Sequence, residues 1–189
     1  PIDSHRSVLV FTVERDQAVG MLSLSDAEYI QQVEQEFGRR LGRIEQVGKR
    51  HSYPIHTIKA LEQYRDGLVL LGNAVHTLHP NAAQGFNLGL RDVAGLAECL
   101  RAGLAQGRQA GDTQILKAYV QLRQADQERM IRFTNTLARG FYNRLPVLRS
   151  ARNLAMLLID TLPVLKNEFA ANAMGLAGNQ PRLVRGVAL

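Results

Sequence analysis

One stretch of the chain, residues 72–92, carries the residues best suited to bind a ligand. It follows the apolar run Leu68–Leu71, which predicts a strand covered on both faces, as in a parallel sheet. Asn73 stands where that strand ends, at the sheet edge where cofactors bind in open α/β folds. Its amide both donates and accepts hydrogen bonds, which suits the hydroxyl groups of a ribose or ribityl chain.

The second half of the same stretch predicts a site for an anion. Gly85 allows a ligand to come close to the backbone, and apolar residues on one face predict a helix from Phe86 to about Leu104. The first N–H groups of a helix have no partner within it, and the helix dipole adds about half a positive charge there. We therefore expect this turn to face a negatively charged group.

Seven positions in the stretch match a known motif in order and spacing: Gly72, Ala74, His76, Pro80, Gly85, Asn87 and Asp92. Through them the chain resembles the class A flavoprotein aromatic hydroxylases, the family of para-hydroxybenzoate hydroxylase, at its second flavin-binding motif. Asn73 stands where the family usually has aspartate. In this respect the chain resembles the ubiquinone-biosynthesis branch of the family. Residues 37–42, 48–54 and 141–144 also resemble that branch, so the likeness covers nearly the whole chain.

The resemblance implies a role for each part of the motif toward FAD. Asn73 would hydrogen-bond the ribityl chain. The loop from Pro80 to Gln84 would lie against the isoalloxazine ring. Pro80 is the one residue expected beside the reacting atoms, and no residue is assigned as an acid or base. The helix start would face the N1–C2=O edge, which becomes negative in reduced flavin. The predicted cofactor-binding residues are Gly72, Asn73, Pro80, Gln84, Gly85, Phe86 and Asn87.

The resemblance also implies a reaction and its partners. FAD reduced by NAD(P)H would form a C4a-hydroperoxide with dioxygen and hydroxylate a polyprenylated phenol. Such enzymes need a G-x-G-x-x-G fingerprint after a first strand, and the sequence contains none. We therefore expect a C-terminal half that lacks the N-terminal half of the enzyme and alone binds FAD weakly and is inactive. A homo-oligomer or a ubiquinone-biosynthesis complex are further expected partners.

The pattern predicts an α/β fold, α+β within this chain, in three parts. Residues 1–60 are predicted to belong to a substrate-covering sheet, residues 61–111 to hold the strand–loop–helix unit of a Rossmann-like FAD-binding domain, and residues 112–189 to be helical. In the first part, β-branched and aromatic residues predict strands at Ser7–Val13 and Ala18–Leu22.

Capping signals place the helices. Ser25 and Glu28 form a capping box, which predicts a helix from Ser25 that Gly38 closes, followed by an extended segment over residues 44–55. In the third part, Asp112 or Thr113 caps a long helix, and Pro146 starts another.

The amphipathic stretch Val147–Leu165 has two interpretations. It packs on the body or another subunit, or it contacts an anionic membrane surface or a prenyl tail. Pro163 interrupts it, and a last helix is predicted over Leu165–Leu176.

The composition excludes some classes of protein and suggests one rival function. Hydrophobic residues make up 46% and charged residues 21%, which excludes a disordered chain, and the single cysteine excludes a disulfide framework. Residues 139–189 hold seven of the 23 lysines and arginines but only two acidic residues. The rival function is a non-catalytic basic helical module that binds nucleic acid or a membrane surface, but no nucleic-acid motif accompanies the charge.

The sequence contains no clear metal-binding or targeting signal. His76 and His79 lack a third ligand at suitable spacing, so no metal is expected. Without a signal peptide or an 18-residue apolar run, the expected location is the cytoplasm or the surface of the inner membrane.

Overall fold

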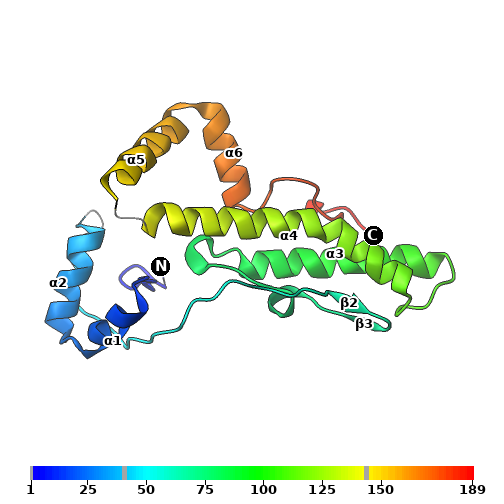
Figure 1. Ribbon diagram of the computed structural model, residues 1–189, viewed down its shortest axis with the longest axis horizontal. Helices are drawn as coiled ribbons and strands as arrows, with labels where there is room; N and C mark the ends of the chain where they lie inside the picture. The colour runs from blue at the N-terminus through cyan, green and yellow to red at the C-terminus, as the bar shows by residue number, and fades with distance from the viewer. Residues whose placement is uncertain (1, 40–41, 143–144) are drawn as a thin grey trace. The chain divides into compact units, whose positions relative to one another are not determined.

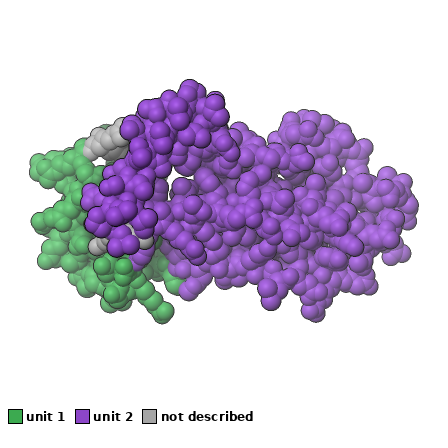
Figure 2. Space-filling view, turned by 45° about the horizontal axis from the view of Figure 1, so that its top comes forward, with its two compact units in different colours: residues 1–54 green, residues 55–189 purple. Residues whose placement is uncertain are grey.

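The computed structural model describes residues 2–39, 42–142 and 145–189 (Figure 1). Residues 40, 41, 143 and 144, which belong to two of the segments that resemble the hydroxylase family, lie outside it. The chain forms two compact units, residues 1–54 and residues 55–189 (Figure 2). Described residues are mostly helical, and each described strand has only two residues.

The first unit contains two helices, α1 (Arg15–Ser23) and α2 (Asp26–Phe37). The predicted capping box is confirmed: the Glu28 carboxylate accepts from the Ser25 N–H at 2.9 Å, and the Ser25 hydroxyl accepts from the Glu28 N–H at 3.4 Å. Gly38 ends α2 as predicted, since its N–H donates to the Glu34 carbonyl. The sequence therefore determines this helix through its two ends.

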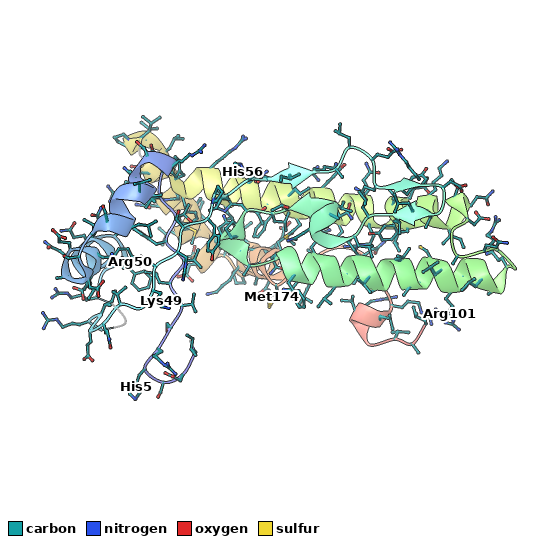
Figure 3. The ribbon with its side chains drawn as sticks, turned by 90° about the horizontal axis from the view of Figure 1, so that it is seen from below. His5, Lys49, Arg50, His56, Arg101 and Met174 are labelled. Atoms are coloured by element: carbon teal, nitrogen blue, oxygen red, sulfur yellow. The ribbon has the colours of Figure 1, made fainter. Side chains whose placement is uncertain are left out.

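The two strands predicted in the first unit are wrong. Ala18–Leu22 lies within α1, and Ser7–Val13 forms no strand among the described residues. A strand needs a hydrogen-bonded neighbour, and β-branched residues alone do not supply one. Residues 42–54 are also unpaired, but Arg50 attaches them to the helices: it donates to Asp26 at 2.9 Å, and its guanidinium lies 4.9 Å from the Tyr29 ring centre (Figure 3).

The second unit begins with two small antiparallel pairs of strands. β1 (Ile58–Lys59) pairs with β4 (His76–Thr77), and β2 (Tyr64–Arg65) pairs with β3 (Leu68–Val69). The prediction that Leu68–Leu71 belongs to a parallel sheet is therefore wrong for the described chain. The run forms one arm of a hairpin, and Leu68 is exposed because no second layer covers it.

Two long helices, α3 (Gly85–Ala105) and α4 (Thr113–Tyr142), lie side by side and form the body of this unit (Figure 1). Both predicted helices are confirmed, and Asp112 provides the cap for α4 by accepting from the Gln114 N–H at 2.7 Å. Leu78, Leu88 and Met130 form the buried apolar cluster, which Ile131 and Phe133 extend.

A helical hairpin, α5 (Pro146–Thr161) and α6 (Pro163–Ala173), follows. Pro146 starts α5 as predicted, whereas α6 begins at Pro163, earlier than expected, because proline fits the first turn of a helix. Neither helix contains a buried residue, although Phe169 of α6 contacts Phe133 of α4, with ring centres 5.8 Å apart. No helix in the described residues has the length and apolar character to span a bilayer.

Candidate functional site

The turn that follows β3 rests directly on α3. Residues Gly72–Ala74 form a short 3-10 turn, η1, and Gly72 has a φ of +54°, a conformation that favours glycine. A Cβ on Gly89 of α3 would lie 3.5 Å from the Gly72 Cα, so the two backbones are close. Asn73, at the centre of the turn, is exposed. The turn therefore presents its amide side chain outward from a fixed backbone.

Asp92 of α3 holds both ends of this turn. One oxygen, Oδ2, lies 2.7 Å from His76 Nε2 and accepts from the Gly72 N–H at 3.3 Å. Both the Asp92 and His76 side chains are fully buried. A carboxylate that binds the residues before and after Asn73 fixes the direction in which Asn73 points.

Two residues of α4 hold Asp92 in turn. Its second oxygen, Oδ1, accepts from Arg123 Nε at 3.0 Å and from Gln127 Nε2 at 3.1 Å. Burial raises the pKa of Asp92, but the hydrogen bonds from His76 and Gln127 and the charge of Arg123 together bring the pKa below its ordinary value. Asp92 is therefore an ionised carboxylate with four hydrogen-bond partners.

A second buried carboxylate, Asp126, continues the network. Its Oδ2 accepts from Arg91 Nε at 3.0 Å and from the terminal nitrogen of Arg123 at 2.5 Å, and Arg129 donates to Oδ1. Arg123 therefore bridges both aspartates, and its side chain is fully buried. We call these two aspartates, the three arginines, His76 and Gln127 the buried polar network.

The loop between β4 and α3 is fixed by side-chain contacts. It contains the short 3-10 turn η2 (Pro80–Ala82), and Asn81 donates to the Thr134 carbonyl of α4 at 3.1 Å. Ala83 has a φ of +51°, which is unusual for a residue with a side chain. Gln84 is buried and donates from Nε2 to the Ala173 carbonyl at 2.5 Å. This loop is thus anchored to α4 and to the end of α6.

The start of α3 has the properties of an anion site. No described side chain caps it, and its first turn contains no acidic residue. Phe86 and Asn87 are exposed there. The first N–H groups of the helix and the positive end of its dipole thus lie at Gly85 and these two exposed residues. These features fit the electron-rich edge of a reduced flavin, and Asn73 fits the hydroxyl groups of its ribityl chain.

The predicted site residues lie around one helix end, but not all in the expected way. Asn73, Pro80, Phe86 and Asn87 are exposed, which leaves them available to a ligand. The side chain of Gln84 instead binds the C-terminal segment, so only its backbone remains available. The roles of these residues toward FAD stay predictions.

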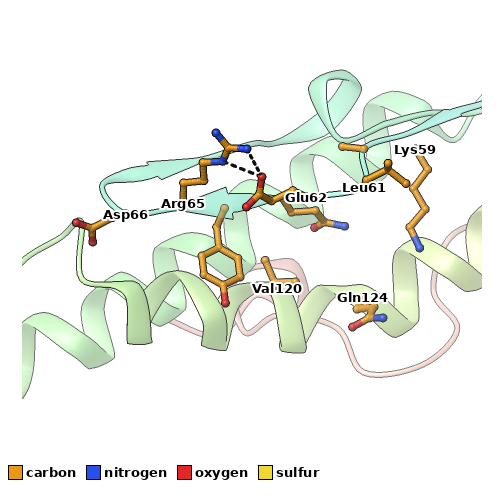
Figure 4. A pocket seen from close by; sticks show the side chains of 10 residues that line it. Lys59, Leu61, Glu62, Arg65, Asp66, Val120 and Gln124 are labelled. Atoms are coloured by element: carbon orange, nitrogen blue, oxygen red, sulfur yellow. Dashed lines mark hydrogen bonds and ion pairs between the residues drawn. The ribbon is translucent and has the colours of Figure 1, made fainter.

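A pocket of about 690 Å³ lies elsewhere, between the residues from Lys59 to Asp66 and the α4 residues Val120 and Gln124 (Figure 4). None of the predicted site residues line it. Its rim carries an exposed ion pair between Arg65 and Glu62 at 2.7 Å. An exposed ion pair does not indicate a catalytic centre, so we do not assign the site there.

The polar residues of α4 were not among the residues predicted from the sequence. Arg123, Asp126 and Gln127 occupy the same helix face as the buried Tyr119 and Met130, and this spacing could have revealed them. His76, considered above as a metal ligand, is bound to Asp92 instead. Among the described residues, no group of three or more His, Cys, Asp or Glu side chains could hold a metal ion.

Comparison with known proteins identifies the family of the chain. A model of the FAD-binding domain family matches residues 1–134. The ubiquinone hydroxylase UbiL of Rhodospirillum rubrum is 39% identical over the whole chain, which covers 45% of that protein. The 3-demethoxyubiquinol 3-hydroxylase of Escherichia coli is 34% identical over 82% of the chain, or 39% of its own length. The mitochondrial ubiquinone biosynthesis monooxygenase COQ6 of Drosophila melanogaster is 27% identical over 93% of the chain and 43% of its own length.

The chain therefore spans less than half the length of these curated relatives.

Proposed function

The chain belongs to the FAD-binding domain family, and from this premise we propose that it is the C-terminal part of an FAD-dependent aromatic monooxygenase. The substrate would be a polyprenylated phenol of ubiquinone biosynthesis, since the relatives named above are ubiquinone hydroxylases. Within that group we propose the activity of a 2-octaprenyl-6-methoxyphenol hydroxylase, which the wording of the motif at residues 77–92 resembles. The observation that carries the proposal is Asp92, which holds the turn around Asn73 against the uncapped start of α3.

Each part of the site has a task toward the cofactor. When bound, FAD would carry electrons from NAD(P)H to dioxygen and transfer one oxygen atom to the aromatic ring of the substrate. Asn73 holds the ribityl hydroxyls, and the N–H groups of Gly85, Phe86 and Asn87 stabilise negative charge on the ring edge. Pro80 and the loop to Gln84 form the wall beside the ring. No residue is proposed as acid or base.

The rest of such an enzyme would cover α3. Phe86, Leu90 and Val93 lie one helical turn apart and are exposed, with more than half of each side chain accessible. An apolar stripe of this kind on a folded helix indicates a partner. We propose that an N-terminal half with the G-x-G-x-x-G fingerprint packs on this stripe and completes the FAD site. The chain alone then binds FAD weakly and has no activity.

The α5–α6 hairpin suggests where the enzyme acts. Its helices carry exposed leucines and valines together with Arg149 and Arg152, which is typical of a surface that contacts anionic lipid. A polyprenyl substrate resides in the membrane, so we propose a cytoplasmic protein that binds the inner-membrane surface through this hairpin. Self-association or entry into a ubiquinone-biosynthesis complex through the same hairpin is the competing outcome. We propose no contact with nucleic acid.

A chimera tests the proposed function. The N-terminal half of the Rhodospirillum rubrum relative, fused to this chain, is expected to purify with bound FAD and to consume NAD(P)H when a polyprenylated phenol is added. The matched control carries Asn73→Ala, which should weaken FAD binding about tenfold because a hydrogen bond to the ribityl chain is lost. A folded chimera that stays colourless in excess FAD would contradict the proposal.

A further inference from the structure

We propose that the segment Ala173–Ala177, which follows α6, positions the cofactor-binding loop, and that Gln84, Arg91 and Arg129 are the positioning residues that join them. This inference rests on the proposed function, because the loop in question is the predicted flavin-facing one. Figure 3 labels Met174, which with Leu176 is exposed in this segment, next to the first turn of α3. The segment lies about ninety residues beyond the loop in sequence, so only the fold brings the two together.

Three side chains bind alternate carbonyl groups of the segment. Gln84 donates to the Ala173 carbonyl at 2.5 Å, Arg91 donates to the Gly175 carbonyl at 2.9 Å, and Arg129 donates to the Ala177 carbonyl. Gln84 and Arg91 are each at most 5% exposed. A buried donor that loses its acceptor is costly, so these bonds fix the segment on α3 and α4.

The backbone of the segment is shaped around these donors. Gly175 has a φ of +71°, and a Cβ there would overlap the Arg91 guanidinium and lie 2.9 Å from Gln84 Oε1. Gly178 has a φ of +79°, and a Cβ there would overlap Arg129. The chain thus passes close to Arg91 and Arg129 at two glycines whose backbone conformation favours glycine.

The bonds also reach the turn at Asn73. Arg91 and Arg129 share Asp126 with Arg123, and Arg123 binds Asp92, which holds the Gly72 N–H. The segment therefore contacts the cofactor-binding loop directly at Gln84 and the turn at Asn73 through the buried polar network. Both halves of the predicted site share this support.

The position of Gln84 matters because the next residues expose the anion-binding N–H groups. The Gln84 carbonyl accepts from the Leu88 N–H at 2.9 Å, which is the first hydrogen bond of α3. If Gln84 moves, the first turn of the helix frays and its free N–H groups lose their common direction. Electrostatic stabilisation depends on donors that are already oriented before charge develops.

Native-state hydrogen exchange in the full 189-residue chain tests the inference without FAD. The test variant is Gln84→Met, which keeps the side chain's size but removes the donor. The matched control is Gln180→Met, because Gln180 also donates to the Gly175 and Ala177 carbonyls but forms no bond with α3. The readout is the exchange rate of the Leu88, Gly89 and Leu90 amides, measured with the denaturation midpoint of the same variant.

After correction for any change in global stability, Gln84→Met should raise the amide exchange rates at Leu88–Leu90 about tenfold. Gln180→Met should change the exchange rates only of residues after Ala173. Should Gln84→Met fail to fold, Gly175→Ala gives the same readout, since it pushes against Arg91 and Gln84. Equal rates at Leu88–Leu90 in the wild type and the test variant would overturn the inference.

The two proposals can fail separately. If the exchange result holds but the chimera binds no FAD, the segment supports the helix start and the proposed function is wrong. If the chimera binds FAD and the exchange rates do not change, the proposed function stands and the positioning role is wrong.

Discussion

The α3–α4 pair and the α5–α6 hairpin each consist of two consecutive helices in contact, yet they differ in what they bury. Between α3 and α4 the largest fully buried side chain is Arg123, and its partners are two aspartates. In the α5–α6 hairpin, α5 has an apolar face, but no residue of either helix is buried. The pair that holds the site is therefore stabilised by contacts within the chain, whereas the hairpin has an apolar surface left for another partner.

The largest effect should come from removing the central charge of the packed pair. Arg123→Met leaves Asp92 and Asp126 buried with one fewer donor each, so we expect a loss of about 3–5 kcal/mol in the free energy of unfolding. Arg149→Met, on the exposed surface of α5, is the matched control and should change it by less than about 0.5 kcal/mol. Urea denaturation followed by circular dichroism measures both. Equal effects would contradict the comparison.

A smaller effect is expected where Gly103 of α3 packs against α4. A Cβ on Gly103 of α3 would overlap the Ile115 side chain of α4, so Gly103→Ala should destabilise the chain by about 1–3 kcal/mol. Gly140 lies in α4, where an added Cβ would have no atom within 4 Å. Gly140→Ala should therefore raise the free energy of unfolding by up to about 1 kcal/mol. Opposite signs in thermal or urea denaturation would confirm that α3 and α4 pack as described.

Features controlled by neighbouring residues could be predicted from the sequence. The capping box at Ser25, the start of α3 and the proline that begins α5 each depend on a few adjacent residues, and all three agree with the structure. Strands depend on distant partners. Leu68–Leu71 has the composition of a buried strand, but the described chain supplies only the neighbour from its own hairpin.

Only those parts of the candidate site that depend on neighbouring residues could be predicted. The motif located the turn and the helix start, because its residues are close in sequence. It did not predict that Gln84 binds a carbonyl 89 residues away, nor that Arg123 and Gln127 complete the shell of Asp92. Their signal in the sequence is that charged residues fall on the same face of the predicted helix as its apolar residues.

The pH dependence of stability distinguishes the buried network from the exposed hairpin. The pKa of Asp92 lies below its ordinary value of 3.8, so the folded state favours the carboxylate. Its contribution is complete above the unfolded pKa and is lost as the pH falls through the folded pKa. Between pH 5 and pH 2 the free energy of unfolding should fall, and the fall should be smaller in Asp92→Asn.

Asp160→Asn is the control for this titration. Asp160 forms an exposed ion pair with Lys166 at 2.9 Å, and exposed pairs contribute little. Its pH profile should follow that of the wild type. A profile for Asp92→Asn that also follows the wild type would show that the network does not depend on the ionised aspartate.

The smallest effect on stability, and the largest on association, should come from the apolar face of α5. Leu157 is 58% exposed, so Leu157→Ser should change the free energy of unfolding by less than about 0.5 kcal/mol. If the hairpin binds lipid, the same substitution lowers the fraction of protein that pellets with anionic vesicles, and Arg149→Ala with Arg152→Ala removes the part of binding that salt weakens. If a second copy covers the hairpin instead, sedimentation shows an oligomer that Leu157→Ser dissociates, and vesicle binding does not change. A loss of stability as large as that of a core leucine would mean that α5 is packed within the chain, and the contrast with α3 and α4 would then be wrong.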